Sequence, residues 1–286
     1  MLILHDPASA DYGSSMRPEQ PARVTKSAAH LQTAHPDWLW RVPNPAAEDF
    51  LLLAHAPEFL KRLQIPRDFD ADTPHFPNIY THARRAVGAA LTAAEIAVMD
   101  HQPVFSLMRP PGHHATYEQA MGFCYLNSVA IAALFLREKL HVPRVAIWDF
   151  DAHHGNGTEA IVHTRHGILF TSVHQYPGYP GTGTRSFDNC KNWPIAPHTP
   201  RAQHMDALRQ SLDAILAFEP TVILVSAGFD AYARDPITSM TLEIEDFATL
   251  GRWLRETRLP AAAVLEGGYS DDLPLLIDAW LSSWEK

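Results

Sequence analysis

The sequence predicts an α/β protein with a central, mostly parallel β-sheet and helices on both faces. Two patterns in the 286 residues predict it: short apolar, β-branched runs recur, and stretches with helical spacing of apolar residues separate them. Such alternation is typical of a doubly wound sheet. A hydrophobic content of 46% suffices for a sizeable core, and no repeat or shift in composition marks a linker. We therefore expect one domain over residues 1–286.

Five runs are expected to form buried parallel strands, because they are short, apolar and rich in β-branched residues. In chain order they are 104–107, 145–148, 168–173, 222–225 and 262–265. Four stretches carry apolar residues three and four positions apart, as amphipathic helices do. They are 83–98, 127–138, 203–218 and 244–257. Proline clusters between these elements predict loops, among them 177–180 and 194–200.

Charge and cysteine content restrict the function. The chain has 23 basic and 32 acidic residues, and the net charge of -9 argues against nucleic acid and mildly favours cationic partners such as lysine side chains or polyamines. Two cysteines are too few for a disulfide framework and favour a reducing compartment. The longest apolar run, 129–136, is far shorter than the about 20 residues that span a bilayer. The sequence predicts a soluble cytoplasmic protein without membrane contact and leaves its oligomeric state open.

Polar side chains follow the predicted strands. The strand at 145–148 runs into Asp-Phe-Asp-Ala-His-His, residues 149–154, and the strand at 104–107 leads to His113 and His114. Asp230 follows the strand at 222–225, and Tyr269 follows the strand at 262–265. Because the carboxyl ends of parallel strands meet at one edge of a sheet, we expect these groups to lie close together.

The residue types in this set predict metal-assisted hydrolysis. Asp151, His153 and Asp230 would form a three-ligand oxygen and nitrogen site with open positions, as catalytic zinc uses to bind water and substrate. His113 or His114 could take a proton from that water. Tyr269 could donate its hydroxyl to the oxyanion of a tetrahedral intermediate. The predicted reaction is amide or ester hydrolysis.

Six motifs in order resemble the zinc-dependent histone deacetylase family, and the resemblance spans roughly residues 17–270. The motifs are Arg-Pro-Pro-Gly-His-His-Ala, Gly-Phe-Cys-Tyr-Leu-Asn, Asp-Phe-Asp-Ala-His-His-Gly-Asn-Gly-Thr, Tyr-Pro-Gly-Thr-Gly, Ala-Gly-Phe-Asp-Ala and Leu-Glu-Gly-Gly-Tyr. The resemblance implies an arginase-like fold and hydrolytic removal of acetyl or other acyl groups from an amine. It also implies inhibition by hydroxamates, which chelate an open zinc site.

The resemblance also implies roles for single residues. Asp151, His153 and Asp230 match the zinc ligands, and Tyr269 matches the catalytic tyrosine. His114 would be the general base and then the acid, while His113 would pair with Asp149 and act electrostatically. The family's monovalent cation site, occupied by potassium in relatives, matches Asp149, Asp151, His153, Ser172 and Val173.

Further matches concern the substrate channel. Phe123, preceded by Gly122, and Tyr179 match aromatic walls that would grip the aliphatic stem of an acyl-lysine. Ile237 matches a further wall position, and Arg23 resembles the arginine of the internal acetate pocket. Asn156 stands where class I members carry an aspartate, which places the chain on the class II-like side, near bacterial histone deacetylase-like amidohydrolases. A neutral partner should leave His114 less basic.

Three functions stay open at this point. The first is a zinc-dependent deacylase acting on acyl-lysine or a similar acylated amine. The second is an acetylpolyamine deacetylase, disfavoured because Ile237 stands where polyamine-selective members carry an acidic residue, although Asp70 or Asp72 could serve instead. The third is a catalytically silent module that binds acyl-lysine, which would be expected to lack a ligand, a histidine or the tyrosine. The remaining histidines, such as His35, His55, His163 and His204, are expected at the surface or at helix caps.

Overall fold

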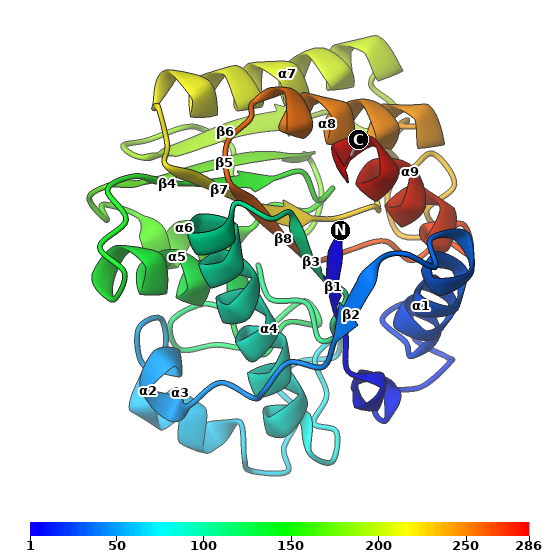
Figure 1. Cartoon of the computed structure of the whole chain (residues 1–286). Coiled ribbons are helices and arrows are strands. Elements are labelled where there is room, and N and C mark those ends of the chain that lie inside the picture. Colours follow the sequence, from blue (N-terminus) through cyan, green and yellow to red (C-terminus); the bar gives the residue numbers. More distant parts are fainter. Residues whose placement is uncertain (286) are drawn as a thin grey trace.

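The structure is a computed structural model and describes residues 1–285. Its strands form one sheet with the order β2-β1-β3-β8-β7-β4-β5-β6, and every neighbouring pair is parallel (Figure 1). The predicted α/β class and single-domain architecture are confirmed. The sheet is parallel throughout the described residues, where we had predicted a mostly parallel one.

All five predicted strands are present, and their ends lie within two residues of the predicted ones. The strands are β1 (Leu2–Leu4), β2 (Leu39–Arg41), β3 (Val104–Ser106), β4 (Val145–Asp149), β5 (Ile168–Gln175), β6 (Cys190–Ile195), β7 (Val222–Ala227) and β8 (Ala261–Leu265). The sequence did not predict β1, β2 and β6. Two of these three are the edge strands of the sheet.

Helices cover both faces of the sheet (Figure 1). They are η1 (Pro7–Ala10), α1 (Ala22–Ala34), α2 (Glu48–Leu51), α3 (Pro57–Arg62), α4 (Ile79–Asp100), α5 (Ser128–Glu138), α6 (Asn156–Val162), α7 (Arg201–Ala217), α8 (Ile244–Glu256) and α9 (Leu273–Glu285). The four predicted helices are α4, α5, α7 and α8.

Side chains alternate between two apolar cores along each strand. In β4, Val145 and Ile147 face the core that includes α4 and α5, whereas Ala146 and Trp148 face the core of α1, α7, α8 and α9. Both faces of the strand are therefore buried, which explains why the sequence shows a continuous apolar run here.

One predicted loop begins two residues too early, because β6 extends to Ile195, while residues 196–200 form a loop as expected. Pro194, within the proline cluster at 194–200, lies in β6 and pairs with His174 of β5. Proline lacks the N–H that a central strand would need, but β6 is an edge strand with no further neighbour, so proline is tolerated there.

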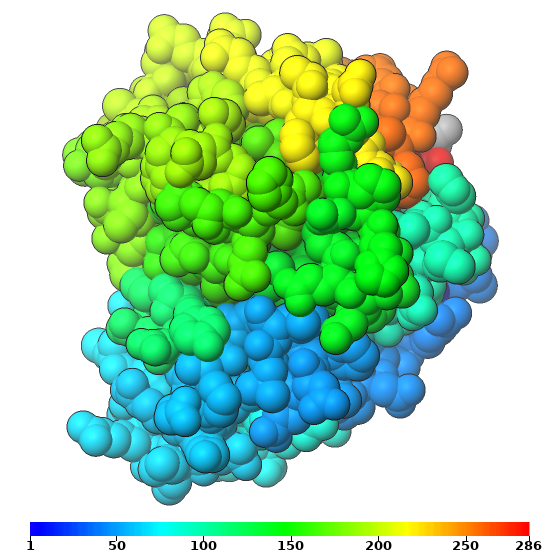
Figure 2. Space-filling model, turned by 90° about the vertical axis from the view of Figure 1, so that its left-hand side faces the viewer, coloured from blue at the N-terminus to red at the C-terminus, as the bar shows by residue number. Residues whose placement is uncertain are grey.

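Two histidines expected at the surface are buried. His204 in α7 and His55, between α2 and α3, are each 1% exposed. The imidazole of His55 lies 2.9 Å from the carbonyl oxygen of Thr116, and its Nε2 accepts the Asn127 N–H at 2.9 Å. His55 thus joins the α2–α3 region to the segment before α5. Figure 2 shows the segment of α2 and α3 (blue to cyan) directly against the green segments on this side of the molecule.

Strand register brings the loops that follow the strands to one level. Asp149 at the end of β4 pairs with Ser172 of β5 and with Ser226 of β7. The loops after these strands consequently begin side by side at the carboxyl edge of the sheet. Within residues 1–285, no helix has the length and apolar character needed to cross a membrane. The cytoplasmic location stays a prediction.

Candidate active site

Three side chains from two loops form a candidate metal centre. Asp151 and His153 follow β4, and Asp230 follows the neighbouring strand β7. Their ligand atoms all lie within 4.8 Å of one another. The His153 Nδ1 is 2.8 Å from Asp230 Oδ2 and 3.2 Å from Asp151 Oδ1. The structure therefore brings together the three residues that the sequence singled out as ligands.

The surroundings of this triad fit a divalent metal ion. Both carboxylates are fully buried, and burial, followed by the charge of Asp151, raises the pKa of Asp230. Two adjacent buried carboxylates are costly without a cation. Gly267 lies so close that a Cβ there would be 2.3 Å from Asp230 Oδ2 and 2.5 Å from Asp151 Oδ2. Carboxylate oxygens with one imidazole are a donor set typical of catalytic zinc.

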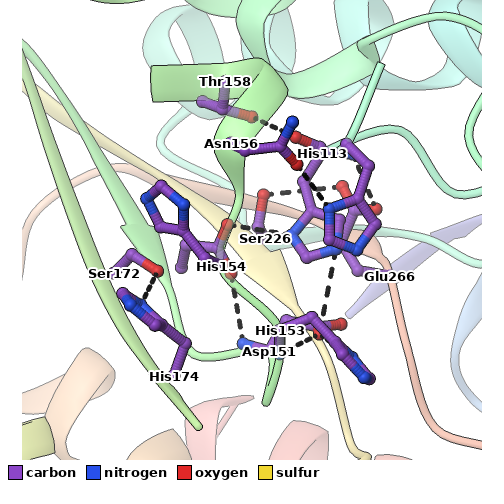
Figure 3. Close-up of polar contacts among 12 residues, drawn as sticks. His113, Asp151, His153, His154, Asn156, Thr158, Ser172, His174, Ser226 and Glu266 are labelled. Carbon is purple, nitrogen blue, oxygen red and sulfur yellow. Dashed lines mark hydrogen bonds and ion pairs between the residues drawn. The ribbon is translucent and has the colours of Figure 1, made fainter. Parts of the chain in front are cut away.

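Two histidines after β3 lie beside the triad, and their rings are 4.0 Å apart between centroids. His114 Nδ1 is 2.8 Å from Asn156 Oδ1, and His113 Nδ1 is 3.1 Å from Asp149 Oδ2. Figure 3 shows His113 next to Asp151 and His153. One imidazole is thus paired with an amide and the other with a carboxylate.

These partners separate the two histidines electrostatically. Burial alone would lower the pKa of His113, but the charges of Asp151, Asp149 and Glu266 outweigh it and raise the pKa to about 10. For His114, burial and then the neighbouring imidazoles of His113 and His153 hold the pKa well below its usual range. His114 is therefore the neutral imidazole of the pair.

Tyr269 follows β8 and lines the same cavity as His114 and His153. Its backbone N–H donates to Asp235 Oδ2 at 2.8 Å. The guanidinium of Arg23 lies 4.8 Å from the centre of the Tyr269 ring, and Arg23 Nε donates to the Gly268 carbonyl oxygen at 2.7 Å. Burial raises the pKa of the Tyr269 phenol well above its usual value. Tyr269 is therefore protonated at neutral pH and able to donate.

A cavity of about 260 Å³ connects these groups to the surface. Its walls include Gly122, Phe123, Tyr179 and Ile237, and His114, His153 and Tyr269 also line it. The predicted channel residues thus gather around one cavity. Arg23 is the exception, because it lies behind the Tyr269 ring and does not line this cavity.

Close packing shapes the wall formed by Gly122. A Cβ at this position would lie 2.6 Å from His114 Cδ2 and 2.9 Å from Tyr179 Cε1. Its φ of +56° is also in the left-handed region, which favours glycine. Only glycine therefore lets Tyr179 approach His114, whose ring centroid is 5.1 Å from that of Tyr179.

The positions matched to a monovalent cation site also come together. Asp149 and Ser172 are register partners, Val173 is the next residue of β5, and Asp151 and His153 lie in the turn after Asp149. The Ser172 hydroxyl is 2.9 Å from His174 Nδ1 (Figure 3). The occupant of this site stays a prediction.

Several functional neighbours were not assigned a role from the sequence. Glu266 is fully buried at the end of β8, and its Oε2 accepts the backbone N–H groups of Gly112 (2.7 Å) and His113 (3.1 Å). Burial raises the pKa of Glu266 to about 7. Its position directly after a buried strand was the available signal. Pro18 also lines the cavity, but it lies in a loop and offered a weaker signal, whereas Asp72, which the sequence suggested as an acidic residue for a polyamine, lies at this cavity.

His154 connects the loop after β4, which carries Asp151 and His153, to the loop that carries Tyr179. Its Nδ1 lies 2.8 Å from Thr182 Oγ1, and its Nε2 lies 3.3 Å from Glu159 Oε2. His154 is buried and is not part of the triad. His154 therefore helps to hold the loop of Thr182 against α6, which carries Glu159.

This chain is similar to known deacetylases and amidohydrolases. Residues 17–285 match the family model described as histone deacetylase domain. A probable deacetylase of Methanothermobacter thermautotrophicus is 35% identical, with 95% of this chain and 86% of that protein covered. A histone deacetylase-like amidohydrolase of Pseudomonas aeruginosa is 34% identical, with 93% and 74% covered. The crystal structure of an acetylpolyamine aminohydrolase from Burkholderia pseudomallei superposes with a TM-score of 0.92 at 26% identity, covering 99% of this chain and 98% of that one.

Proposed function

Because the chain belongs to the histone deacetylase domain family, we propose that it is a zinc-dependent amidohydrolase that removes acetyl or other acyl groups from acylated amines. One observation carries the proposal. The Asp151, His153 and Asp230 triad adjoins a cavity lined by a neutral imidazole and a protonated phenol. These are the groups that hydrolysis of an amide requires.

The metal ligands would be Asp151, His153 and Asp230, and a bound zinc ion would supply Lewis-acid chemistry to the carbonyl and to water. His114 would act as the base. Its Nδ1–H donates to Asn156 Oδ1, which leaves Nε2 with a free lone pair to accept a proton from the attacking water. The same nitrogen can then return the proton to the leaving amine.

His113 and Tyr269 would stabilise charge. His113 is held by Asp149 and carries a positive charge at neutral pH, so it would act electrostatically beside the reacting carbonyl. The Tyr269 hydroxyl would donate to the oxyanion as it forms, a contribution of about 3 kcal/mol for one well-placed donor. His113 pairs with Asp149, and the Tyr269 backbone N–H donates to Asp235. These bonds hold both groups in place before the reaction, as stabilisation of a developing charge requires.

The channel walls favour a slender aliphatic stem. Phe123 and Tyr179 would contact the methylene groups of an acyl-lysine or an acylated alkylamine, while the amide reaches the triad. Phe123 packs edge-on against Tyr269 at 5.7 Å between ring centroids. The walls and the phenol therefore form one packed unit that would exclude bulk water.

A polyamine substrate is the second candidate. Its support is the likeness to the protein named acetylpolyamine aminohydrolase and the carboxylate of Asp72 at the cavity, which could pair with an ammonium group. Ile237 lies at the same cavity and offers no such charge. A silent binding module has no comparable support, because the triad, both histidines and the tyrosine are all present.

The test is a comparison of kcat/KM for acetyl-lysine peptides, longer acyl-lysine peptides and acetylated polyamines on the zinc-loaded protein, with and without a hydroxamate. Turnover of an acyl-lysine peptide with inhibition by the hydroxamate is the expected result. In the same panel, Ile237→Glu should raise the relative rate on acetylated polyamines. Absence of turnover on every substrate, with zinc bound, would overturn the proposal.

A further inference from the structure

Asp235 is a buried carboxylate between two functional loops and has no role in the chemistry described above. It lies in the loop after β7, five residues beyond Asp230, and is 7% exposed. Its Oδ1 accepts the Ile237 N–H at 3.0 Å, and its Oδ2 accepts the Tyr269 N–H at 2.8 Å. Within residues 1–285 it forms no ion pair with a lysine, an arginine or a histidine. Each carboxylate oxygen of Asp235 thus accepts one backbone N–H.

The two donors belong to two residues that line the same cavity from different loops. Ile237 forms part of the wall, and Tyr269 presents the phenol. The chain before Tyr269 is Gly267-Gly268, and Gly268 has a φ of +114°. Glycine leaves the backbone unusually free, so an external hydrogen bond is needed to fix the amide of Tyr269.

The same loop also holds a metal ligand in place. The Thr238 hydroxyl donates to the Asp230 carbonyl oxygen, so the wall segment and the ligand are hydrogen-bonded to each other. Asp235 adds the connection from this segment to the tyrosine loop, 34 residues further along the chain. The Asp235 carboxylate thus connects the backbone of Tyr269 to the wall segment, in addition to the contacts that Arg23 and Phe123 make with Tyr269.

We propose that Asp235 is a positioning residue, which fixes the Tyr269 phenol and the Ile237 wall relative to the metal ligand Asp230. The inference rests on the proposed function for its kinetic consequence, but its structural consequence can be measured without turnover. Asp235→Asn replaces one acceptor oxygen by an NH₂ group that cannot accept a hydrogen bond, so one of the two bonds is lost.

The first test measures amide hydrogen exchange by NMR in the full-length parent, in Asp235→Asn and in a matched control, Asp271→Asn. Asp271 lies on the same loop as Tyr269, but it is exposed, and among residues 1–285 its ion-pair partner is Lys26. In Asp235→Asn, the Tyr269 or Ile237 amide should exchange at least about tenfold faster, since a lost hydrogen bond lowers local protection. The control should match the parent. Unchanged exchange at both amides would overturn the inference, whatever the activity of the parent.

The second test is a double-mutant cycle with Tyr269→Phe. Because a displacement of about 1 Å can cost about a hundredfold in rate, Asp235→Asn should lower kcat by about tenfold or more while zinc content stays at one equivalent. In the Tyr269→Phe background, which lacks the hydroxyl, the same substitution should change kcat by less than about twofold. An equal loss in both backgrounds would show that Asp235 acts through general stability and would overturn its positioning role.

If Asp235→Asn does not fold, the variant Asp235→Glu provides the test. Asp235→Glu retains both acceptor oxygens on a side chain one methylene longer, and it should give a smaller loss of kcat together with faster exchange at the same two amides. An inactive, zinc-loaded parent would refute the proposed function, while the exchange measurement would still decide whether Asp235 holds the two loops.

Discussion

Two groups of buried charged side chains lie next to each other at the carboxyl edge of the sheet, and they differ in how their charge is balanced. The acidic centre holds four fully buried carboxylates, and the ion pairs that they form within the described part of the chain are with imidazoles. Its members are Asp149, Asp151, Asp230, Glu266, His113 and His153. The arginine cluster has the opposite composition, with Arg23, Arg109 and the single carboxylate of Glu19.

The two guanidinium groups of the arginine cluster share one carboxylate and otherwise donate to carbonyl oxygens. Glu19 accepts from Arg109 through both oxygens, with Nη2 to Oε2 at 2.7 Å, and also from Arg23 at 3.4 Å. The remaining donors reach carbonyl oxygens, including Ser9 for Arg109 and Gly268 for Arg23. Every buried charge has a fixed partner, and such a group stabilises a structure without requiring a ligand.

The acidic centre is arranged differently, because two carboxylates, Asp151 and Asp230, adjoin the single imidazole of His153. The comparison teaches that like charges gathered around one imidazole favour a ligand-binding role, whereas guanidinium groups held by a shared carboxylate and by carbonyl oxygens favour a structural one. The two groups are in contact, since Arg23 donates to the carbonyl oxygens of Glu266 and Gly268, on either side of Gly267.

The largest expected effect is loss of the ion from the acidic centre. Asp230→Ala should abolish zinc binding and turnover together, because one ligand and half of the paired negative charge disappear. For the chelator-treated parent, zinc at about 100 times its Kd should raise the free energy of unfolding by about 2.7 kcal/mol. Metal analysis measures the zinc content of both proteins, and thermal unfolding with and without zinc measures the stabilisation.

Glu19→Gln is the control for that prediction. It alters the arginine cluster and leaves all three ligands in place, so zinc should still stabilise the folded variant. Zinc stabilisation that disappears in Glu19→Gln but persists in Asp230→Ala would reverse the roles assigned to the two groups.

The next effect concerns Tyr269, which lies between the two groups. Tyr269→Phe removes the hydroxyl and keeps the ring over Arg23, so kcat should fall by about 10²- to 10³-fold with zinc content unchanged. Tyr117→Phe removes a hydroxyl from a tyrosine that is 50% exposed and should leave kcat unchanged. Equal rates for Tyr269→Phe and the parent would mean that the phenol packs without taking part in the chemistry.

The sequence predicted the acidic centre better than the arginine cluster for a physical reason. Asp151, His153 and Asp230 directly follow buried strands, so the pattern places them at the sheet edge. Glu19 lies in a loop, 90 residues from its partner Arg109, and nothing local indicates this pairing. Asp235 was missed similarly, since its role depends on the amide of Tyr269, 34 residues away.

The fold shows the same limit. The strands β4 and β7 were predicted because both faces are buried and their sequences are continuously apolar. The edge strand β2 exposes Leu39 and Arg41, so it shows no buried apolar pattern, and β6 contains a proline that its edge position tolerates. The burial of His55 depends on a carbonyl oxygen of Thr116, which no side-chain pattern reveals.

A smaller effect is expected when the balance of the arginine cluster is broken. Glu19→Gln leaves two buried guanidinium groups without a carboxylate and should lower the free energy of unfolding by about 3 kcal/mol in urea denaturation. Asp271→Asn removes a carboxylate from the exposed pair with Lys26 and should leave the urea midpoint unchanged. If both variants unfold at the parent midpoint, the arginine cluster is not a stabilising unit.

The smallest effect is the pH dependence of the difference in unfolding free energy between the parent and Glu19→Gln. Burial would raise the pKa of Glu19, but the charges of Arg109 and Arg23 outweigh it and lower the pKa below the ordinary value of 4.5. A carboxyl with a depressed folded pKa contributes stability that is fully present above the unfolded pKa and is lost as pH falls through the folded pKa. Glutamine does not titrate. The gap in unfolding free energy between the parent and Glu19→Gln should therefore be constant above about pH 4.5 and shrink below it. Urea unfolding of both proteins across this range measures the gap, and a gap that widens on acidification would show that Glu19 is not held ionised by the two arginines.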